Sequence, residues 1–375
     1  RNAGFKLAPV DTNLFPAGFN NLNPDFMPLC IQAAQAAVER ACPRAQRILI
    51  IAEQHTRNLF YLESLETLRN VFEMAGIEAR IASLRDDLEE PLSIDLPSGK
   101  TCLLEPLERQ GNRVGLGEFS PCLVLLNNDL SAGRPEILEG LEQEVIPPLA
   151  AGWSTRKKSE HFTQYHQVAK EFAAQIDIDP WLVSPLSLQC GEVDFKDRSG
   201  SECLAKNVGE MLVAIQVKYD EYGIDKEPFV VVKADSGTYG MGIMTVKNAD
   251  EVLSLNRKQR NKMASAKEGL TVENVLVQEG VYTFETLGEE QAVAEPVIYM
   301  MDHFVVGGFY RVHTGRGVNE NLNAPGMHFE PLAFVQPCNT PDKDETPDSA
   351  PNRFYAYGVI ARLALLAAAR ELAAV

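Results

Sequence analysis

The chain has 375 residues, of which 45% are hydrophobic and 23% charged, a balance typical of globular proteins. This length is enough for two domains or for one large domain. The net charge of −17 argues against non-specific binding to nucleic acid or to an anionic membrane, because both attract positively charged proteins. We therefore expect neither nucleic acid nor a membrane among its partners.

The cysteines and the apolar segments indicate a cellular compartment. The seven cysteines are scattered, odd in number and without any C-x-x-C pair, a pattern that favours reduced thiols over disulfides or a zinc site. No apolar stretch reaches the length of a membrane span, and residues 1–5 lack the apolar core of a signal peptide. The sequence therefore predicts a cytoplasmic protein.

Strands and helices are predicted to alternate in residues 1–150. Apolar runs at 47–52, 77–82 and 122–126 predict buried strands, and leucines at helical spacing predict a helix over 59–76. Such a strand–helix–strand unit is typical of a parallel α/β sheet, so we expect an α/β substrate domain here. The other predictions for this half are an irregular lead-in over 1–28, a helix over 29–40, an edge hairpin with a loop over 86–118 and a helix over 137–146.

Polar clusters follow two of these predicted strands, at residues 53–58 and 127–129. In open α/β sheets, ligands bind at the carboxyl ends of the strands. The arginine of the first cluster suits a substrate carboxylate. An alternative is that Thr56 caps the following helix and that the rest of the cluster is solvated; both interpretations stay open. The candidate substrate residues are His55, Arg57, Asn58 and Asn128.

The second half, residues 151–375, contains a lysine followed by a glycine-rich loop. The apolar run 229–232 predicts a buried strand that ends at Lys233, and the loop at 237–242 leads into a second strand over 243–246. Glycines let backbone amides approach phosphate oxygens, and a lysine adds a positive charge. The lysine precedes the glycines, unlike a P-loop, and a strand rather than a helix follows them, unlike a dinucleotide fingerprint. The alternative is an ordinary β-hairpin with an exposed lysine.

This order of elements resembles the ATP-grasp superfamily, in which a strand lysine and a glycine hairpin hold the phosphates of ATP. The resemblance also implies that residues 278–281, at the end of the predicted strand 273–281, form a hinge that contacts adenine through backbone groups. We expect the glycine hairpin to act as a lid over the nucleotide. The implied ATP-binding residues are Lys233, Ser236, Gly237, Thr238, Tyr239, Gly240, Met241, Gly242, Gln278, Glu279, Gly280 and Val281.

A further predicted hairpin, with strands at 295–301 and 305–312, places Arg311 at its far end. Phosphoryl transfer depends mainly on positioning and on neutralising negative charge. Lys233 and Arg311 are therefore the predicted catalytic residues.

The stretch 315–326 allows two alignments. It resembles the magnesium-binding stretch of the D-alanine ligase branch, although its asparagines follow the glutamate by one and three residues instead of two. It also resembles the substrate loop of glutathione synthetases, with an insertion. The first alignment makes Glu320, Asn321 and Asn323 the ligands of Mg²⁺, and the second makes Arg316 and Asn321 substrate residues. The two exclude each other, and a surface turn is the third interpretation.

Taken whole, the sequence resembles the proteobacterial glutamate–cysteine ligase family. This resemblance implies an ATP-grasp-like nucleotide-binding and catalytic region over 151–375 with a C-terminal helix. It also implies ATP and Mg²⁺ as cofactors, glutamate and cysteine as substrates, and γ-glutamylcysteine, the first intermediate of glutathione synthesis, as product. The segments that carry the resemblance are residues 50–81, 125–141, 151–162, 230–246 and 315–334.

Two other functions stay open. One is a different ATP-grasp carboxylate–amine ligase, such as a glutathione synthetase or a peptide ligase. The other is a non-catalytic nucleotide-binding or scaffold protein. The apolar C-terminal helix over 353–374 is expected to pack in a core or to form the interface of a homo-oligomer.

Overall fold

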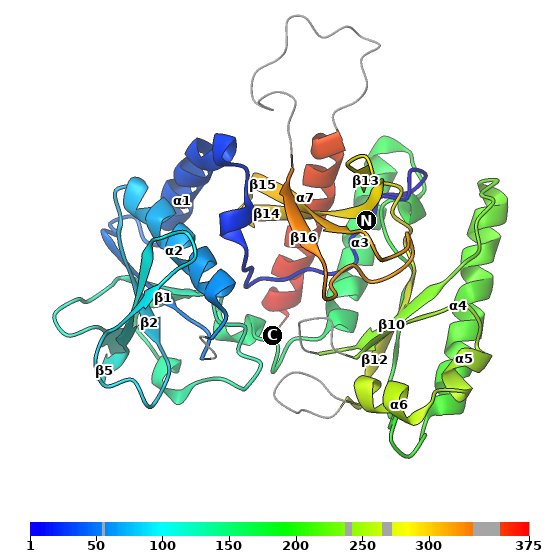
Figure 1. Ribbon diagram of the computed structural model, residues 1–375, viewed down its shortest axis with the longest axis horizontal. Coiled ribbons are helices and arrows are strands. Elements are labelled where there is room, and N and C mark those ends of the chain that lie inside the picture. Colours follow the sequence, from blue (N-terminus) through cyan, green and yellow to red (C-terminus); the bar gives the residue numbers. More distant parts are fainter. Residues whose placement is uncertain (55–56, 237–241, 265–271, 333–352, 375) are drawn as a thin grey trace, which may run out of the picture.

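The computed structural model describes residues 1–54, 57–236, 242–264, 272–332 and 353–374 (Figure 1). Residues 1–150 contain a six-stranded sheet of order β3-β4-β2-β1-β7-β8, in which β3 is antiparallel to β4 and all other neighbours are parallel. The predicted parallel α/β sheet and its edge hairpin are thus confirmed. The strands of this half, including a separate hairpin, are β1 (Arg47–Ile51), β2 (Glu78–Ser83), β3 (Leu92–Asp95), β4 (Thr101–Pro106), β5 (Glu108–Gln110), β6 (Arg113–Gly115), β7 (Leu123–Leu126) and β8 (Glu144–Ile146).

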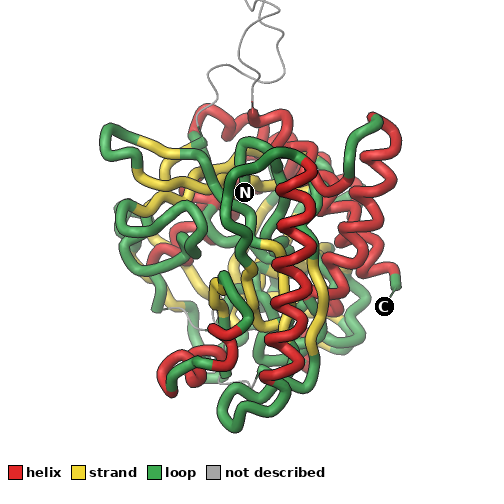
Figure 2. The backbone as a smooth tube through the Cα atoms, turned by 90° about the vertical axis from the view of Figure 1, so that its right-hand side faces the viewer, coloured by secondary structure: helices red, strands yellow, loops and turns green. Residues whose placement is uncertain are grey.

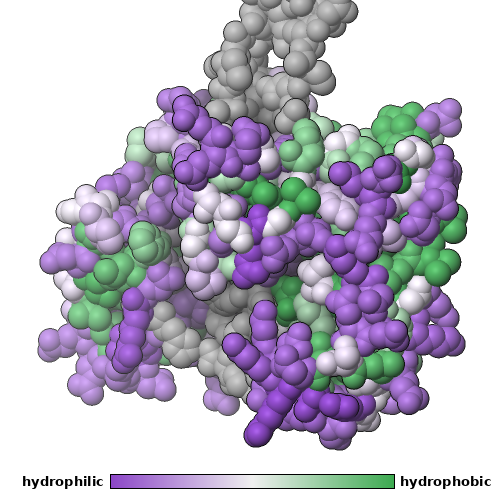
Figure 3. Space-filling view, turned by 45° about the vertical axis from the view of Figure 1, so that its right-hand side comes forward, coloured by the Kyte–Doolittle hydropathy of each residue, from purple (hydrophilic) through white to green (hydrophobic). Residues whose placement is uncertain are grey.

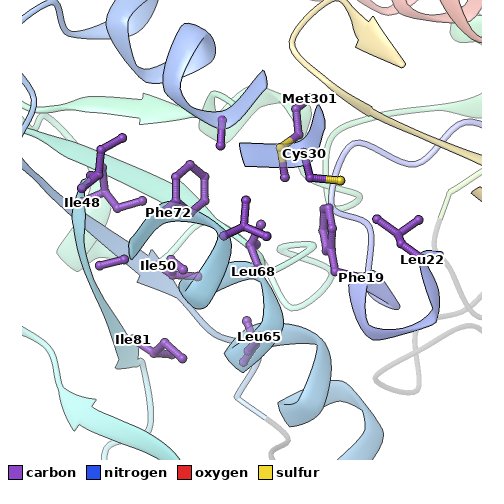
Figure 4. Close-up of a cluster of buried hydrophobic side chains, with 14 of the residues drawn as sticks. Phe19, Leu22, Cys30, Ile48, Ile50, Leu65, Leu68, Phe72, Ile81 and Met301 are labelled. Atoms are coloured by element: carbon purple, nitrogen blue, oxygen red, sulfur yellow. The ribbon is translucent and has the colours of Figure 1, made fainter. Parts of the chain in front are cut away.

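One face of this sheet is buried under α1 (Met27–Ala41) and α2 (Leu59–Met74). Side chains from β1 and β2 interdigitate with the apolar stripe of α2 (Figure 4). Residues of the lead-in, of β14 (Ala292–Met301) and of β15 (Phe304–His313) complete the same core. Burial of this apolar surface is the main force that holds the first half together. Members of this core are Phe19, Leu22, Cys30, Ile48, Ile50, Leu65, Leu68, Phe72, Ile81 and Met301.

The predicted helix over 137–146 is wrong. The chain forms a short 3₁₀ turn there, Glu136–Leu138, and then the edge strand β8. Gly140 between them has φ of 64°, a left-handed conformation that ends helical geometry and suits glycine. The apolar residues therefore pair with β7 and fill the sheet core instead of forming a helical stripe.

The second half contains a four-stranded antiparallel sheet of order β11-β10-β12-β9. The long helix α4 (Ser201–Glu221) runs along one face of this sheet (Figure 2) and shares a buried core with it. The strands are β9 (Ser187–Cys190), β10 (Val230–Ala234), β11 (Ile243–Val246) and β12 (Val275–Glu279).

The basic helix predicted over 249–266 is two short helices, α5 (Asp250–Leu253) and α6 (Arg257–Met263). Asn256 interrupts the run because its side chain caps α6 in a reciprocal capping box with Gln259. Residues 265–271 lie outside the described part of the chain.

A third, antiparallel sheet of order β13-β14-β15-β16 contains the predicted hairpin, which is confirmed. The helices α3 (Lys158–Ile176) and α7 (Arg353–Ala373) lie side by side between this sheet and the sheet of β10 (Figure 1). Ile360, Leu363 and Ala367 of α7 are buried against Phe162 of α3, so the core position expected for the last helix is confirmed. The strands are β13 (Thr286–Leu287), β14 (Ala292–Met301), β15 (Phe304–His313) and β16 (His328–Pro331).

Hydrophilic side chains dominate the face shown in Figure 3. None of the helices within the described ranges is long and apolar enough to cross a membrane. The remaining 3₁₀ turns are Phe19–Asn21, Pro24–Phe26, Leu149–Ala151 and Pro180–Leu182.

Candidate active site

Lys233 lies near the end of β10, on the face of the sheet that points away from α4. Its neighbours Val232 and Ala234 belong to the core under α4, and side chains alternate along a strand, so Lys233 faces α3. Lys233 is only 4% exposed. Its Nζ donates a hydrogen bond to the carbonyl of Val10 and lies 5.2 Å from the ring centroid of Phe162. The alternative of an exposed hairpin lysine is therefore wrong.

The electrostatic surroundings of Lys233 are mixed. Burial lowers the pKa of Lys233 to about 8, with the charge of Asp11 opposing this shift and that of Lys158 adding to it. The ammonium form therefore predominates at neutral pH. A charge held in such a poorly solvated place interacts with a ligand more strongly than it would in water.

Three charged residues that sequence reasoning missed lie around this lysine: Asp11, Arg156 and Lys158. Lys158, at the start of α3, donates from Nζ to the carbonyl of Ala234 at 3.2 Å, and burial lowers its pKa. The ring centroid of Trp153 lies 4.4 Å from Nζ of Lys158 and 5.0 Å from the guanidinium carbon of Arg156. The basic run at 156–158 was the available signal for the two cations, whereas nothing in the sequence around Asp11 indicated its position.

The predicted hinge lies at the end of β12. Gln278 pairs with Val231 in register and so shares the inner face with Lys233. It is 2% exposed, and its side-chain nitrogen has no hydrogen-bond partner within the described residues. Buried polar atoms are normally paired, so this donor is available to a ligand. Gln278 and Lys233 are diagonal neighbours on adjacent strands, about 7–8 Å apart.

Glu279 points to the opposite face and its side chain is fully used there. It forms an ion pair with Lys6 at 2.7 Å and accepts hydrogen bonds from the Trp181 indole at 3.1 Å and the Leu186 amide at 2.8 Å. Both side chains of the ion pair are 1% exposed. Only backbone groups of Glu279 are left for the predicted adenine contact.

Gly280 is required by close packing at this hinge. Its amide donates to the carbonyl of Phe229 at 2.8 Å, and a Cβ atom would come within 2.1 Å of the Phe229 ring. The next carbonyl, of Val281, accepts a hydrogen bond from the Arg1 guanidinium at 3.3 Å.

Arg311 lies on β15 directly opposite Glu295 on β14. Its guanidinium forms an ion pair with Glu295 at 2.7 Å, and Arg1 forms a second one at 2.7 Å. Although burial opposes the charged form, Arg1 and Arg311 lower the pKa of Glu295 to about 2. Arg1 also donates to the carbonyl of Glu320, so it joins Arg311, the hinge end and the predicted metal stretch.

The side chains of Glu320 and Asn321 form their hydrogen bonds and ion pair within the stretch 315–326. The Glu320 carboxylate accepts from the Gly317 amide at 2.6 Å and pairs with Arg316 at 2.9 Å, and these two contacts lower its pKa. The side-chain oxygen of Asn321 accepts from the Asn323 amide at 2.9 Å. Among the residues that the structure describes, no three His, Cys, Asp or Glu side chains converge as a ready metal centre. Neither alignment of the stretch is decided by these contacts.

The two polar clusters of the first half meet at one edge, because β1 and β7 are parallel neighbours. Asn128 donates to the Ala52 carbonyl at 2.9 Å and accepts from the Leu130 amide at 3.0 Å, so its amide links the two strand ends. Asn58 caps α2 through the Phe60 and Tyr61 amides, which is the capping task that the alternative gave to Thr56. The substrate roles of both asparagines stay predictions.

Arg57 is exposed and has no ion pair within the described ranges, so its guanidinium is open to a ligand. Ser236 is also exposed, directly before the predicted lid. At the other end of that loop, Gly242 has φ of 60° and its carbonyl accepts from the Ala234 amide at 2.9 Å. The other predicted residues, which lie outside the described residues, are His55, Gly237, Thr238, Tyr239, Gly240 and Met241.

A chain of contacts joins this edge to Lys233. The Trp153 amide donates to the carbonyl of Asp129 at 2.9 Å, and the Trp153 ring packs on Lys158. Lys158 in turn bonds the end of β10, through its Nζ to the carbonyl of Ala234 at 3.2 Å and through its amide to the carbonyl of the next residue, Asp235, at 2.8 Å. The predicted amino-acid edge and the predicted phosphate site are therefore neighbours.

Arg57→Ala is expected to raise KM for glutamate about tenfold or more and to change KM for ATP far less, because a charge-assisted hydrogen bond is worth about 1.5–3 kcal/mol. Steady-state kinetics with each substrate varied would measure both constants. Arg44→Ala is the matched control, since Arg44 is exposed before the opposite end of β1. An unchanged glutamate KM would assign residues 53–58 to helix capping alone.

The parallel α/β half, the buried strand-end lysine and the polar edge beside it are the arrangement expected of the predicted ATP-dependent carboxylate–amine ligase. The profile of one family, glutamate-cysteine ligase, matches residues 1–372, and the chain belongs to this family. It is also similar to a solved structure named as a gamma-glutamylcysteine synthetase from Methylobacillus flagellatus KT. The two share 64% identity at a TM-score of 0.90, over 99% of this chain and 87% of that one.

Two other solved synthetases are much less similar. A D-alanyl-alanine synthetase A from Vibrio cholerae O1 has 11% identity and a TM-score of 0.36, over 72% of this chain and 67% of that one. The D-cycloserine synthetase DcsG has 11% identity and a TM-score of 0.41, over 87% and 82%. A search of the curated proteins gave no match.

Proposed function

We propose that the protein joins the γ-carboxylate of L-glutamate to the amino group of L-cysteine at this site, with ATP converted to ADP and phosphate. The observation that carries the proposal is the contact chain from Asp129 through Trp153 and Lys158 to the end of β10. It brings the amino-acid edge next to buried cations that suit phosphate groups. Membership of the glutamate–cysteine ligase family supports the choice of the two amino acids.

The first chemical step transfers the γ-phosphoryl group of ATP to the γ-carboxylate of glutamate and releases ADP. Lys233, Lys158 and Arg311 are the groups that we assign to the phosphates, and their charge opposes the negative charge of the transferring group. Lys233 and Lys158 are buried, so water screens their charge little. Gln278 and the backbone at 279–281 are assigned to the adenine.

The second step is attack of the cysteine amine on the acyl phosphate. The new C–N bond forms as the C–O bond to phosphate breaks, and inorganic phosphate leaves with γ-glutamylcysteine as product. Arg57, exposed at the strand-end edge, is assigned to a carboxylate of glutamate. We also assign the predicted lid residues and His55 to the site, although they lie outside the described residues.

Mg²⁺ fits the stretch 320–323 by the chemistry of its donors, because carboxylate and amide oxygens are the ligands that this ion prefers. Its bound charge would neutralise the phosphates. Glu320 forms an ion pair with Arg316, and its side chain is 43% exposed. Such exposed ion pairs contribute about 0–1 kcal/mol to stability. Glu320 can therefore exchange Arg316 for the ion at small cost, and Asn321 and Asn323 supply further oxygens.

Glu320→Gln is expected to raise the Mg²⁺ concentration for half-maximal rate about tenfold, since a charged oxygen ligand is replaced by a neutral one. Magnesium titrations at saturating ATP and amino acids would measure it. Glu330→Gln, an exposed change on β16, is the control. A normal Mg²⁺ requirement together with a raised amino-acid KM would favour the substrate-loop alignment instead.

The reaction itself is tested by ADP release across pairs of amino acids, with mass spectrometry of the product. Glutamate plus cysteine should give γ-glutamylcysteine. Turnover only with γ-glutamylcysteine plus glycine would indicate a glutathione synthetase, and ATP binding without turnover would indicate a non-catalytic protein.

We also propose a cytoplasmic enzyme, supported by the six described cysteines, all of which are free thiols. A homo-oligomer stays a prediction that light scattering of the purified protein would test. The division into a substrate domain over 1–150 and a catalytic region over 151–375 is likewise proposed, and limited proteolysis would test it.

A further inference from the structure

Two backbone carbonyls and one carboxylate of the lead-in face the cations of the phosphate site. Lys233 donates to the carbonyl of Val10, and Arg156 donates to the carbonyl of Thr12 at 2.7 Å. Asp11 lies between them. Although the surrounding protein disfavours its charge, the cations Lys233, Lys158 and Arg156 lower the pKa of Asp11, so it is an anion at neutral pH.

We propose that residues 10–12 occupy the phosphate site of the free enzyme and that ATP displaces them. The inference rests on the proposed function of Lys233 and adds a residue, Asp11, that competes with the nucleotide. The lysine and arginine side chains at this site are only 4–6% exposed. Buried charges need polar partners. The lead-in supplies a carbonyl to Lys233, and it shares Arg156 with the buried Glu371 carboxylate, which pairs with that arginine at 2.7 Å.

The lead-in is anchored on both sides of this stretch. Upstream, Lys6 is held by its buried ion pair with Glu279. Downstream, Phe15 is buried in the core of the first half, and the Pro16 carbonyl accepts from Asn127 at 2.9 Å. Asp11, between the anchors, remains open to solvent. Residues 10–12 can therefore leave the cations while both anchors stay in place.

The surrounding charge favours this role over binding of a cation by Asp11. A magnesium ion or a substrate ammonium group at its carboxylate would face Lys233, Lys158 and Arg156, the three cations that lower the pKa of Asp11, and like charges repel. An anion of higher charge than Asp11 is favoured in the same place. The triphosphate of ATP meets that description.

The test is ATP affinity, measured by calorimetry with ATP in the presence and in the absence of MgCl₂ at pH 6.5, below the pKa of Lys233. Asp11→Asn removes the competing charge and keeps the size of the side chain, so it should bind ATP about threefold to tenfold more tightly than the wild type. Asp25→Asn, at an exposed aspartate in the same lead-in, should bind as the wild type does. Unchanged or weaker ATP binding by Asp11→Asn would overturn the inference, and a loss seen only with Mg²⁺ would identify a metal ligand instead.

A pH profile gives a second readout that a structural role would not move. The charged groups that face Lys233 are Asp11 from the lead-in, Lys158 from α3, Asp235 at the end of β10 and Arg1. In the wild type kcat/KM for ATP should fall as pH rises through about 8, where the free enzyme loses the ammonium of Lys233. In Asp11→Asn the fall should begin at lower pH, because the charge that raises this pKa is gone. An unmoved profile counts against the inference.

The proposed function is judged separately, from the product that the wild type forms. Tighter ATP binding by Asp11→Asn in a chain that makes no γ-glutamylcysteine would support the inference and overturn the proposed substrates. If the wild type makes the product but Asp11→Asn leaves both ATP affinity and the pH profile unchanged, the proposed substrates would be supported and the inference overturned. A wild type that binds no ATP would overturn both.

Discussion

Lys233→Ala should lower kcat/KM for ATP by about a hundredfold or more while the protein stays folded. Loss of a charged contact to a transferring phosphate costs roughly 3 kcal/mol of transition-state stabilisation, and no exposed residue can replace a charge held at 4% exposure on the inner face of β10. Steady-state kinetics at varied ATP would give the constant, with circular dichroism to verify the fold.

Lys247→Ala is the matched control for this change. Lys247 follows β11, the strand that pairs with β10, and is exposed with an ion pair to Glu227. It should retain activity close to that of the wild type. Near-wild-type turnover of Lys233→Ala would remove this lysine from the phosphate site.

Lys6→Met should lower the free energy of unfolding by about 3–5 kcal/mol, because it leaves the buried carboxylate of Glu279 without its counter-charge. The remaining partners of Glu279, the Trp181 indole and the Leu186 amide, are neutral donors that compensate only in part. Urea unfolding followed by tryptophan fluorescence would measure the change, since Nζ of Lys6 lies 4.1 Å from the ring centroid of Trp181.

The double variant Lys6→Met, Glu279→Gln separates charge from packing. It removes both charges and keeps an oxygen acceptor, so it should recover about 2 kcal/mol or more of the loss. A double variant as unstable as Lys6→Met alone would mean that the aliphatic part of the lysine, packed on Trp181, carries the stability.

The sequence predicted elements whose pattern is local. The apolar runs of β1, β2, β7 and β10 could be identified as buried strands from the sequence alone, because a short apolar run flanked by turn residues is typical of a buried strand. The same holds for Lys233, whose place at a strand end follows from that run. At 137–146 the local pattern was ambiguous between helix and strand, and one glycine with a left-handed backbone decided it.

The candidate site was predicted only in part, because its remaining members are brought together by distant contacts. Asp11 lies in a stretch without periodicity, and only the fold places it beside cations more than 140 positions away. Glu279 shows the same limit. Its place in a strand was predicted, but its ion pair with Lys6, which lies 273 residues earlier, could not be predicted from the local sequence.

The contacts of the lead-in also bear on how the protein is made. Lys6 pairs with Glu279, Ala17 with Tyr299 and Arg1 with Glu295, at separations of 273, 282 and 294 residues. A ribosome adds about 5–20 residues per second, so these partners follow the lead-in on the order of tens of seconds later. The sheet of residues 1–150 can form during that time. The proposed nucleotide site can therefore be completed only after the partners at 279–299 have been synthesised, well after the sheet of residues 1–150.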